Sequence, residues 1–382
     1  ETLVKFTHFL FGILSLLVIY KISKIFLPLK LSLLSALIFY SNPVVGWESI
    51  TSYVDLGRTF FELLGVLSFI YWIEKREFKW LVVSSSMLGL AVYTKLLSVL
   101  SLAPFLVFII FLSYKTKSKL FLNAFSFFTL SFFFSLPWFL FSFVNTGNPV
   151  YPLGEYTITA PVDSLNILQA LEDPISPLYL IFFPLIIANI KKFDLRLIYI
   201  FVYSLMGFTS WYFLSRLSGA RYILPYLAAF SVVLSFTVFR YSKNKIVYYF
   251  LICLVLITSL ISIFYRSFAN HKFLPVLLGK ESKTEFLAKN LNFSYGDFYD
   301  TDKYFKKNIK AYDRVLLYGF HNLYYVDFPF VHSTWVKEGD KFNYIAVQNT
   351  ILPSRFSDWK EIYYNKQTKV RLYTKEGREW VY

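Results

Sequence analysis

The sequence predicts a polytopic α-helical membrane protein with a small α/β domain at its C-terminal end. Of its 382 residues, 56% are hydrophobic and only 16% are charged, whereas soluble domains carry about 25% charged residues. The long apolar stretches end near residue 265, and the sequence beyond that point is more polar. We therefore predict a transmembrane domain in residues 1–265 and an α/β domain outside the cytoplasm in residues 266–382.

Ten apolar stretches of the membrane region are each close to the length that crosses ~30 Å of hydrocarbon. They cover approximately residues 4–20, 29–44, 57–73, 80–94, 97–113, 120–143, 177–190, 197–213, 222–239 and 246–264. We therefore predict about ten membrane-spanning helices.

The positive charges of the membrane region lie in alternate loops. The segments "KISKIFLPLK", "EKREFK", "YKTKSK", "KKFDLR" and "RYSKNK" each hold three Lys or Arg, whereas residues 43–56 and 145–176 hold none. This is the positive-inside pattern of membrane proteins, and it places both ends of the chain outside the cytoplasm. The net charge of +15 therefore reflects membrane topology, and we expect no nucleic-acid partner.

Cysteine and histidine give little sign of a built-in cofactor. Cys253 is the only cysteine, so no intrachain disulfide forms. No P-loop, GxGxxG or GxSxG motif is present, and the four histidines lack metal-ligand spacing; they are His8, His271, His321 and His332. We expect no built-in metal site or other cofactor, and a requirement for a divalent metal stays open.

The polar C-terminal region contains signals for both strands and helices. Alternating or apolar runs at 314–320, 343–349 and 369–375 predict strands. Ser282 and Glu285 have the spacing of a capping box at the start of a helix. These signals predict a small α/β domain.

The segment "SYVDLGRTFFE" (52–62) brings three charges to the start of an apolar run. On a helix, Asp55, Arg58 and Glu62 share one face. A charged side chain facing lipid costs about 2.5–3.5 kcal/mol at mid-depth, so these three must face protein, water or each other. Two interpretations follow: an ion-pair ladder that orients the helix, or a polar cavity at its outer end in which Asp55 is the most exposed.

Basic residues are rare in the predicted outer loops, and each one needs a reason. Between the spans these loops carry only Lys95, Arg216 and Arg221. One explanation is a phosphate or pyrophosphate of a lipid, because Arg and Lys are the usual partners of such oxygens. The other is contact with headgroups, or pairing with acids such as Glu48.

Four segments, taken in order, resemble a known family. "SNPVVGWESITSYVDLGRTFFELL", "MLGLAVYTK", "TGNPVYPL" and "ARYILPYL" are similar to segments of bacterial polyprenyl-phosphate-sugar-dependent glycosyltransferases of the GT-C fold. These enzymes are relatives of the protein O-mannosyltransferases and the lipid A aminoarabinose transferases. The resemblance implies an integral protein of the bacterial inner (plasma) membrane. It also implies transfer of a hexose or pentose, with inversion, from a polyprenyl-phosphate donor to a glycan, lipid or protein acceptor outside the cytoplasm.

The resemblance also implies roles for particular residues. The main catalytic aspartate of such enzymes lies in the first outer loop, which we expect upstream of Glu1, so only Asp55 is an auxiliary catalytic candidate here. The candidates for substrate binding are Glu48, Arg58, Lys95, Tyr151, Arg216, Arg221 and Tyr222.

Two other functions are compatible with a polytopic protein. An O-antigen-type polymerase or ligase also has arginines in its outer loops, but more commonly lacks a soluble domain of this size after its last span. A transporter of lipid-linked sugars tends to carry charges near the membrane midplane and inverted repeats. The charges here gather at helix ends, and no repeat is evident, so we favour the glycosyltransferase.

Overall fold

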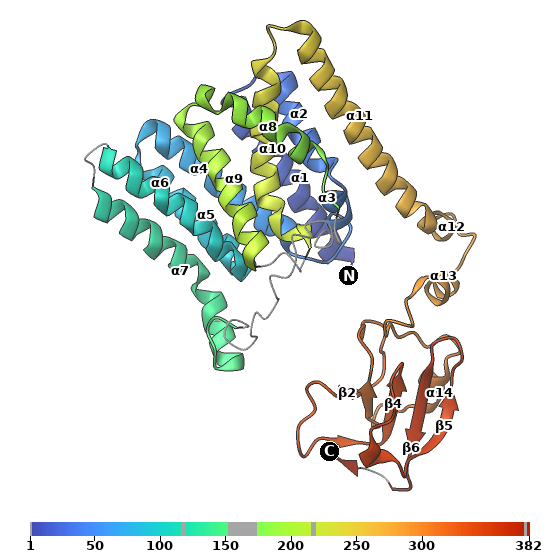
Figure 1. Ribbon diagram of the computed structural model, residues 1–382. Helices are drawn as coiled ribbons and strands as arrows, with labels where there is room; N and C mark the ends of the chain where they lie inside the picture. Colours follow the sequence, from blue (N-terminus) through green and yellow to red (C-terminus); the bar gives the residue numbers. More distant parts are fainter. Residues whose placement is uncertain (1, 116–118, 152–173, 215–218, 378–379) are drawn as a thin grey trace. The chain divides into compact units, whose positions relative to one another are not determined.

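The structure is a computed structural model that describes residues 2–115, 119–151, 174–214, 219–377 and 380–382. The chain separates into two compact units, Glu1–Ala269 and Asn270–Tyr382, coloured blue to yellow and orange to red in Figure 1. We describe each unit by itself.

The first unit consists of helices, and each of the ten predicted apolar stretches overlaps one or two of them. The helices are α1 (Thr2–Lys24), α2 (Leu29–Tyr40), α3 (Pro43–Glu48), α4 (Asp55–Lys75), α5 (Phe78–Thr94), η1 (Leu96–Ser101), α6 (Leu102–Lys115), α7 (Leu120–Thr146), α8 (Leu178–Asn189), η2 (Ile190–Lys192), α9 (Leu195–Leu214), η4 (Ala220–Ile223), α10 (Leu224–Arg240) and α11 (Lys245–Asn270). Six helical segments among the described residues are long and apolar enough to cross a membrane, and α2 and α5 are shorter apolar helices. The predicted fold class is confirmed, and ten crossings stay a prediction.

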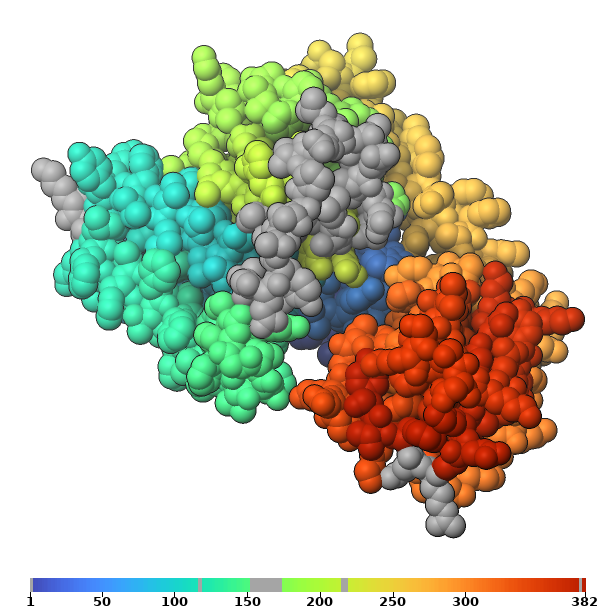
Figure 2. Space-filling model, turned by 60° about the horizontal axis from the view of Figure 1, so that its bottom comes forward, coloured from blue at the N-terminus to red at the C-terminus, as the bar shows by residue number. Residues whose placement is uncertain are grey.

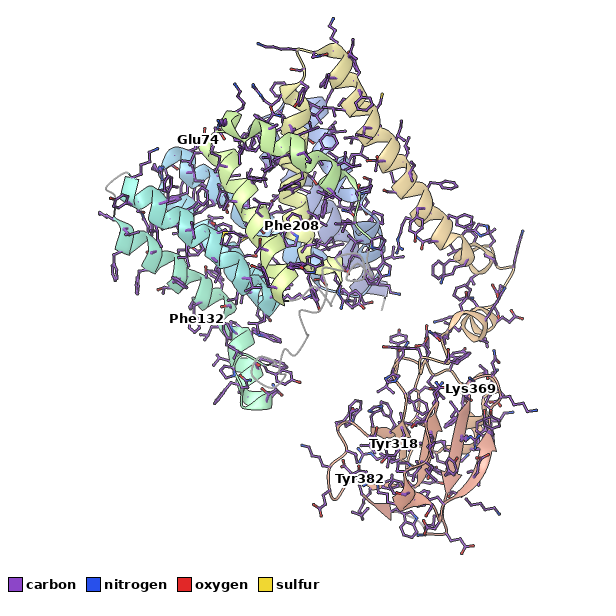
Figure 3. The ribbon with its side chains drawn as sticks, viewed as in Figure 1. Glu74, Phe132, Phe208, Tyr318, Lys369 and Tyr382 are labelled. Carbon is purple, nitrogen blue, oxygen red and sulfur yellow. The ribbon has the colours of Figure 1, made fainter. Side chains whose placement is uncertain are left out.

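Helices α4 and α10 form the centre of this unit. Their most apolar windows are 78% and 83% buried, whereas those of α7 and α11 are only 22% buried. Many apolar side chains of α7 are exposed, as Phe132 is with 56% of its surface (Figure 3). An apolar exposed surface of this kind suits contact with lipid. The charged side chains in the first two turns of α4 are instead buried among the other helices.

Glycines allow two of the helix contacts to be close. A Cβ atom added to Gly207 on α9 would lie 2.2 Å from the ring of Tyr226 on α10. One added to Gly89 on α5 would lie 2.5 Å from the carbonyl oxygen of Ser131 on α7. Small residues commonly let membrane helices approach in this way. Gly207 thereby determines where the Tyr226 ring lies.

The second unit is a small α/β domain built on a mixed sheet. Its elements are η5 (His271–Phe273), α12 (Leu274–Leu277), α13 (Lys283–Asn290), α14 (Tyr304–Asn308), β1 (Val315–Tyr318), β2 (Phe330–His332), β3 (Lys341–Phe342), β4 (Tyr344–Gln348), η6 (Ser354–Phe356), β5 (Lys360–Tyr364), β6 (Val370–Thr374) and β7 (Trp380–Val381). The five-stranded sheet has the order β2-β1-β4-β6-β5. Strand β1 is parallel to β2 and β4, and β6 is antiparallel to β4 and β5.

The sequence signals of this domain are confirmed. The runs at 314–320, 343–349 and 369–375 contain β1, β4 and β6. Ser282 caps α13, and both hydrogen bonds of the capping box with Glu285 are present. The strands bury two apolar clusters, one on each face of the sheet, and in the space-filling view the domain forms one compact body (Figure 2).

Candidate functional site

Three chain segments bring charged side chains together at one end of the helical unit. Asp55 is the first residue of α4, Lys95 lies in the turn between α5 and η1, and Arg221 and Tyr222 lie on η4. We call these four residues the charged cluster. An aspartate suits the first turn of a helix, because the helix dipole is positive there.

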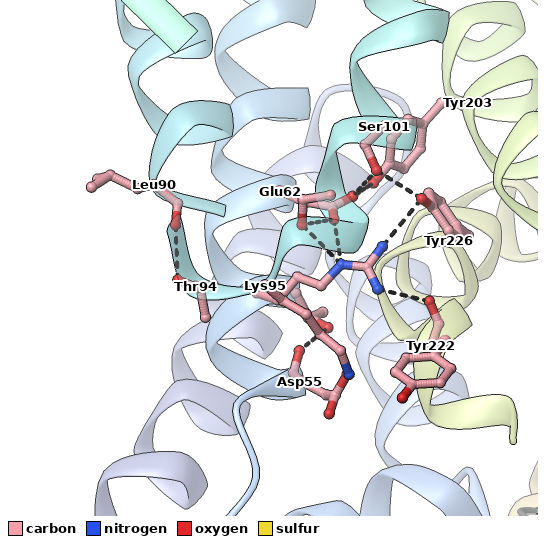
Figure 4. Close-up of polar contacts among 12 residues, drawn as sticks. Asp55, Glu62, Leu90, Thr94, Lys95, Ser101, Tyr203, Tyr222 and Tyr226 are labelled. Carbon is pink, nitrogen blue, oxygen red and sulfur yellow. Dashed lines mark hydrogen bonds and ion pairs between the residues drawn. The ribbon is translucent and has the colours of Figure 1, made fainter. Parts of the chain in front are cut away.

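Aromatic rings and one carboxylate lie against the two cations of the cluster, and Figure 4 shows Asp55, Lys95 and Tyr222 among them. The Nζ of Lys95 lies 2.5 Å from Asp55 Oδ1 and 3.8 Å from the centre of the Tyr222 ring. The Cζ of Arg221 lies 5.2 Å from that same ring and 4.5 Å from the ring of Tyr53. Lys95 and Arg221 therefore share the Tyr222 ring, and Asp55 pairs with Lys95.

The position of Lys95 is unfavourable for its charge. Only 20% of the Lys95 side chain is exposed, and burial lowers the pKa of its ammonium to about 8. Asp55 opposes this change in the pKa, and the positive charges of Arg58 and Arg221 add to it. Because like charges repel, an anion bound beside Lys95 and Arg221 would stabilise both.

The two carboxylate oxygens of Asp55 have different surroundings. The residue is 1% exposed, and Oδ1 pairs with Lys95, whereas Oδ2 is closed to solvent and has no hydrogen-bond partner among the described residues. A buried acceptor left without a donor costs about 1–3 kcal/mol. Among Asp55, Arg58 and Glu62, Asp55 was expected to be exposed; this is wrong, since all three side chains are buried.

Arg58 and Glu62 form an ion pair inside the bundle. Both side chains are 0% exposed, and Arg58 Nε lies 2.6 Å from Glu62 Oε1. The Nη1 of Arg58 donates to the Tyr222 carbonyl at 2.9 Å, and Nη2 donates to the Tyr226 hydroxyl at 3.2 Å. All three nitrogens of Arg58 are therefore engaged within the protein. The guanidinium of Arg58 is buried and is held by Glu62 and by η4 and α10, so the expected contact with substrate is not proposed for it.

The remaining predicted residues lie in other surroundings. Glu48 is buried at the end of α3, where Oε2 lies 3.8 Å from His8 Nε2. Tyr151 is half-buried in a turn after α7, and its N–H donates to the Asn148 carbonyl. Arg216 lies outside the described residues. The structure thus brings together Asp55, Lys95, Arg221 and Tyr222.

Sequence reasoning missed His8, which fixes the start of α4. Its Nε2 accepts a hydrogen bond from the Leu56 N–H at 3.0 Å, so Nδ1 carries the proton and donates to the Thr51 carbonyl at 3.2 Å. The ring therefore satisfies one of the N–H groups that a helix leaves free in its first turn. The only signal in the sequence was a histidine within an apolar helix, where a polar side chain needs a partner.

An apolar cavity of about 310 Å³ lies beside the cluster. It is lined by Leu3, Val4, Thr7, His8, Phe11, Tyr53, Val54, Gly57 and Thr94. Val54 and Thr94 directly precede Asp55 and Lys95 in the chain. Within the part of the chain that the structure describes, no group of three or more His, Cys, Asp or Glu side chains could hold a metal ion.

The chain combines a helical membrane unit, which has charges at the ends of its helices, with a small α/β domain. Comparisons with known proteins support the GT-C fold that the sequence predicts. Residues 1–140 match the family model described as dolichyl-phosphate-mannose-protein mannosyltransferase. Two solved structures are similar to nearly the whole chain, the crystal structures of ArnT from Cupriavidus metallidurans in the apo state and bound to undecaprenyl phosphate.

The likeness to ArnT is one of fold. The TM-scores are 0.58 and 0.55 at 11% and 10% sequence identity, and the matches cover 97% and 95% of this chain and 83% and 82% of ArnT. A search of curated proteins found no match. The chain therefore has the fold of the GT-C glycosyltransferases, and the resemblance predicted from its motifs is confirmed.

Proposed function

We propose that this protein is a membrane glycosyltransferase that takes a sugar from a polyprenyl-phosphate donor and transfers it to an acceptor outside the cytoplasm. The observation that carries the proposal is the charged cluster, in which Lys95 and Arg221 share the ring of Tyr222. The family match of residues 1–140 to mannosyltransferases and the ArnT fold support the class of reaction. The ArnT crystal structure with undecaprenyl phosphate supports the class of donor.

The chemistry requires positive charge beside the leaving group. The acceptor oxygen forms a bond to the anomeric carbon of the sugar while the bond from that carbon to the phosphate oxygen breaks. The acceptor gives up its proton to a base, and the polyprenyl phosphate leaves with the bonding electrons. Lys95 and Arg221 would stabilise the charge that develops on the phosphate, and fixed cations at such a position lower the barrier.

Asp55 has a different part in this proposal. Its Oδ1 pairs with Lys95 at 2.5 Å, which holds the ammonium in place. Its Oδ2 is closed to solvent, so no contact with the substrate is proposed for it. Asp55 is therefore proposed to orient Lys95, and the base is left unassigned.

The two other functions receive less support. The polymerase or ligase and the transporter were the alternatives compatible with a polytopic chain, and the chain instead has the ArnT fold over 97% of its length. The charges of the cluster lie at helix ends, at the start of α4 and on the turns before η1 and α10. A transporter would more commonly place them near the membrane midplane.

A transfer assay tests the proposal. Sealed right-side-out vesicles that contain the full-length protein are supplied from outside with a radiolabelled polyprenyl-phosphate sugar and membrane acceptors. We expect label to move to the acceptors, and Lys95→Ala or Arg221→Ala to lower the rate at least about 100-fold, as loss of groups that stabilise transition-state charge does. Lys79→Ala, which changes an exposed lysine, is the matched control. Transfer by both cluster variants at the rate of the control would overturn the proposal.

A further inference from the structure

A second set of polar side chains comes from the three segments that carry the charged cluster and from α9. We call this set the buried network; it consists of Arg58, Glu62, Ser98, Ser101, Tyr203 and Tyr226. Arg58 follows Asp55 by three residues and Ser98 follows Lys95 by three, whereas Tyr226 follows Tyr222 by four. Residues at these spacings lie on the same face of a helix.

The carboxylate of Glu62 is the centre of the network (Figure 4). Its Oε1 accepts hydrogen bonds from Arg58 Nε at 2.6 Å and from Ser98 Oγ at 2.8 Å. Its Oε2 accepts from Ser101 Oγ and from the Tyr203 hydroxyl, both at 2.5 Å. The network therefore ties α4 to η1 and to α9 through one side chain.

The Tyr226 hydroxyl and Arg58 extend the network to the turn that carries Arg221. The hydroxyl lies 2.7 Å from Ser101 Oγ and accepts from Arg58 Nη2 at 3.2 Å. Arg58 Nη1 donates to the Tyr222 carbonyl at 2.9 Å, and the Ser98 N–H donates to the Lys95 carbonyl at 2.9 Å. Each of the two cation-bearing turns is thus bonded through its backbone to a member of the network.

Stability alone is a weak reason for such a group. Burying an ion pair costs several kcal/mol per ion, and apolar side chains of similar volume often serve the fold equally well. A network of directed hydrogen bonds fixes the relative position of the elements that it joins, and it does so better than apolar packing. Here those elements are the ones that carry Asp55, Lys95 and Arg221.

We infer that Arg58, Glu62 and Tyr226 are positioning residues, which hold Lys95 and Arg221 at the spacing that one phosphate group requires. The inference rests on the proposed function and adds to it a set of residues that touch neither donor nor acceptor. Their contribution is to place the two cations before the ligand arrives, so that binding does not have to order them.

The test compares two buried tyrosine hydroxyls in the full-length protein in detergent. Tyr226→Phe removes one hydroxyl of the network, and the control Tyr179→Phe removes a buried hydroxyl that lies 2.9 Å from Ser231 Oγ, between α8 and α10. Arg58→Lys keeps a positive charge but loses the planar donor group. The readouts are the apparent Tm, the Kd for undecaprenyl phosphate, and KM and kcat of transfer.

We expect the two Tyr→Phe variants to lose similar amounts in Tm. Tyr226→Phe and Arg58→Lys should raise Kd and KM by about fivefold or more, because small misplacements of binding groups are costly, whereas Tyr179→Phe should change Kd by less than about twofold. Should Arg58→Lys fail to fold, the two tyrosine variants still decide the question.

Lys95→Ala separates failure of this inference from failure of the proposed function. If Lys95→Ala weakens binding of undecaprenyl phosphate while Tyr226→Phe binds like Tyr179→Phe, the network is structural only and the inference is overturned. If Lys95→Ala binds like the wild type, the phosphate site itself is wrong.

Discussion

At the scale of single residues, Lys95 is the central residue of the proposed phosphate site. Its ammonium lies between Asp55 and the ring of Tyr222 in a largely closed space, and burial lowers its pKa to about 8. The charge is therefore present at neutral pH and is lost as the pH rises through about 8. Arg221 stays positive over this range, because a guanidinium does not deprotonate in proteins.

This difference predicts how binding depends on pH. A phosphate monoester is already largely a dianion at pH 7, since its second pKa is about 6, so changes above that pH report the protein. We expect the affinity of the wild-type protein for undecaprenyl phosphate to fall between about pH 7 and pH 9, as Lys95 loses its proton. The measurement is Kd against pH in detergent.

The matched variant is Lys95→Arg, whose side chain stays charged throughout the range. Its affinity should be nearly constant over the same pH values. An equal decline in Lys95→Arg and in the wild type would show that a group other than Lys95 titrates, and would contradict the role given to Lys95.

At the scale of elements, the positions of the helices followed from the sequence, but their contacts did not. Apolar runs of nearly membrane length mark helices wherever they occur, so α1 and α11 were predictable. The spacing of Asp55, Arg58 and Glu62 also showed a shared face. Their partners were not predictable, because Lys95 and Tyr226 come from segments far away in the chain, and helix packing decides which faces meet.

Close approach of α9 and α10 is one contact of this kind. A Cβ atom on Gly207 would lie 2.2 Å from the Tyr226 ring, so Gly207→Ala should displace the ring or separate the helices. Overpacking of this kind costs about 1–3 kcal/mol. We expect a lower apparent Tm in detergent and weaker binding of undecaprenyl phosphate, because Tyr226 belongs to the buried network.

Gly57→Ala is the control for this prediction. It also places an alanine in a helix, but the new Cβ atom would meet its nearest neighbour at 3.5 Å, an ordinary contact. Its Tm should fall less than that of Gly207→Ala. If the two variants are equally stable, the tight contact between α9 and Tyr226 is not present in the protein.

At the scale of the whole molecule, the chain has two units and an uneven distribution of positive charge between its loops. A helical unit and a small α/β domain were both predicted, because composition and strand patterns differ between the two parts of the sequence. The order β2-β1-β4-β6-β5 was not predicted, since it depends on pairings between distant strands. The positive-inside pattern supports the proposal that the charged cluster and the C-terminal domain lie outside the cytoplasm.

The central claim is that Lys95 and Arg221 together bind the phosphate of a polyprenyl lipid, and its most direct test is the Kd of the full-length protein for undecaprenyl phosphate in detergent at pH 7. Lys95→Ala and Arg221→Ala should each weaken binding by about tenfold or more, as loss of a charged hydrogen-bonding partner does, while Lys79→Ala should bind like the wild type. Wild-type affinity in the double variant Lys95→Ala/Arg221→Ala would contradict the account.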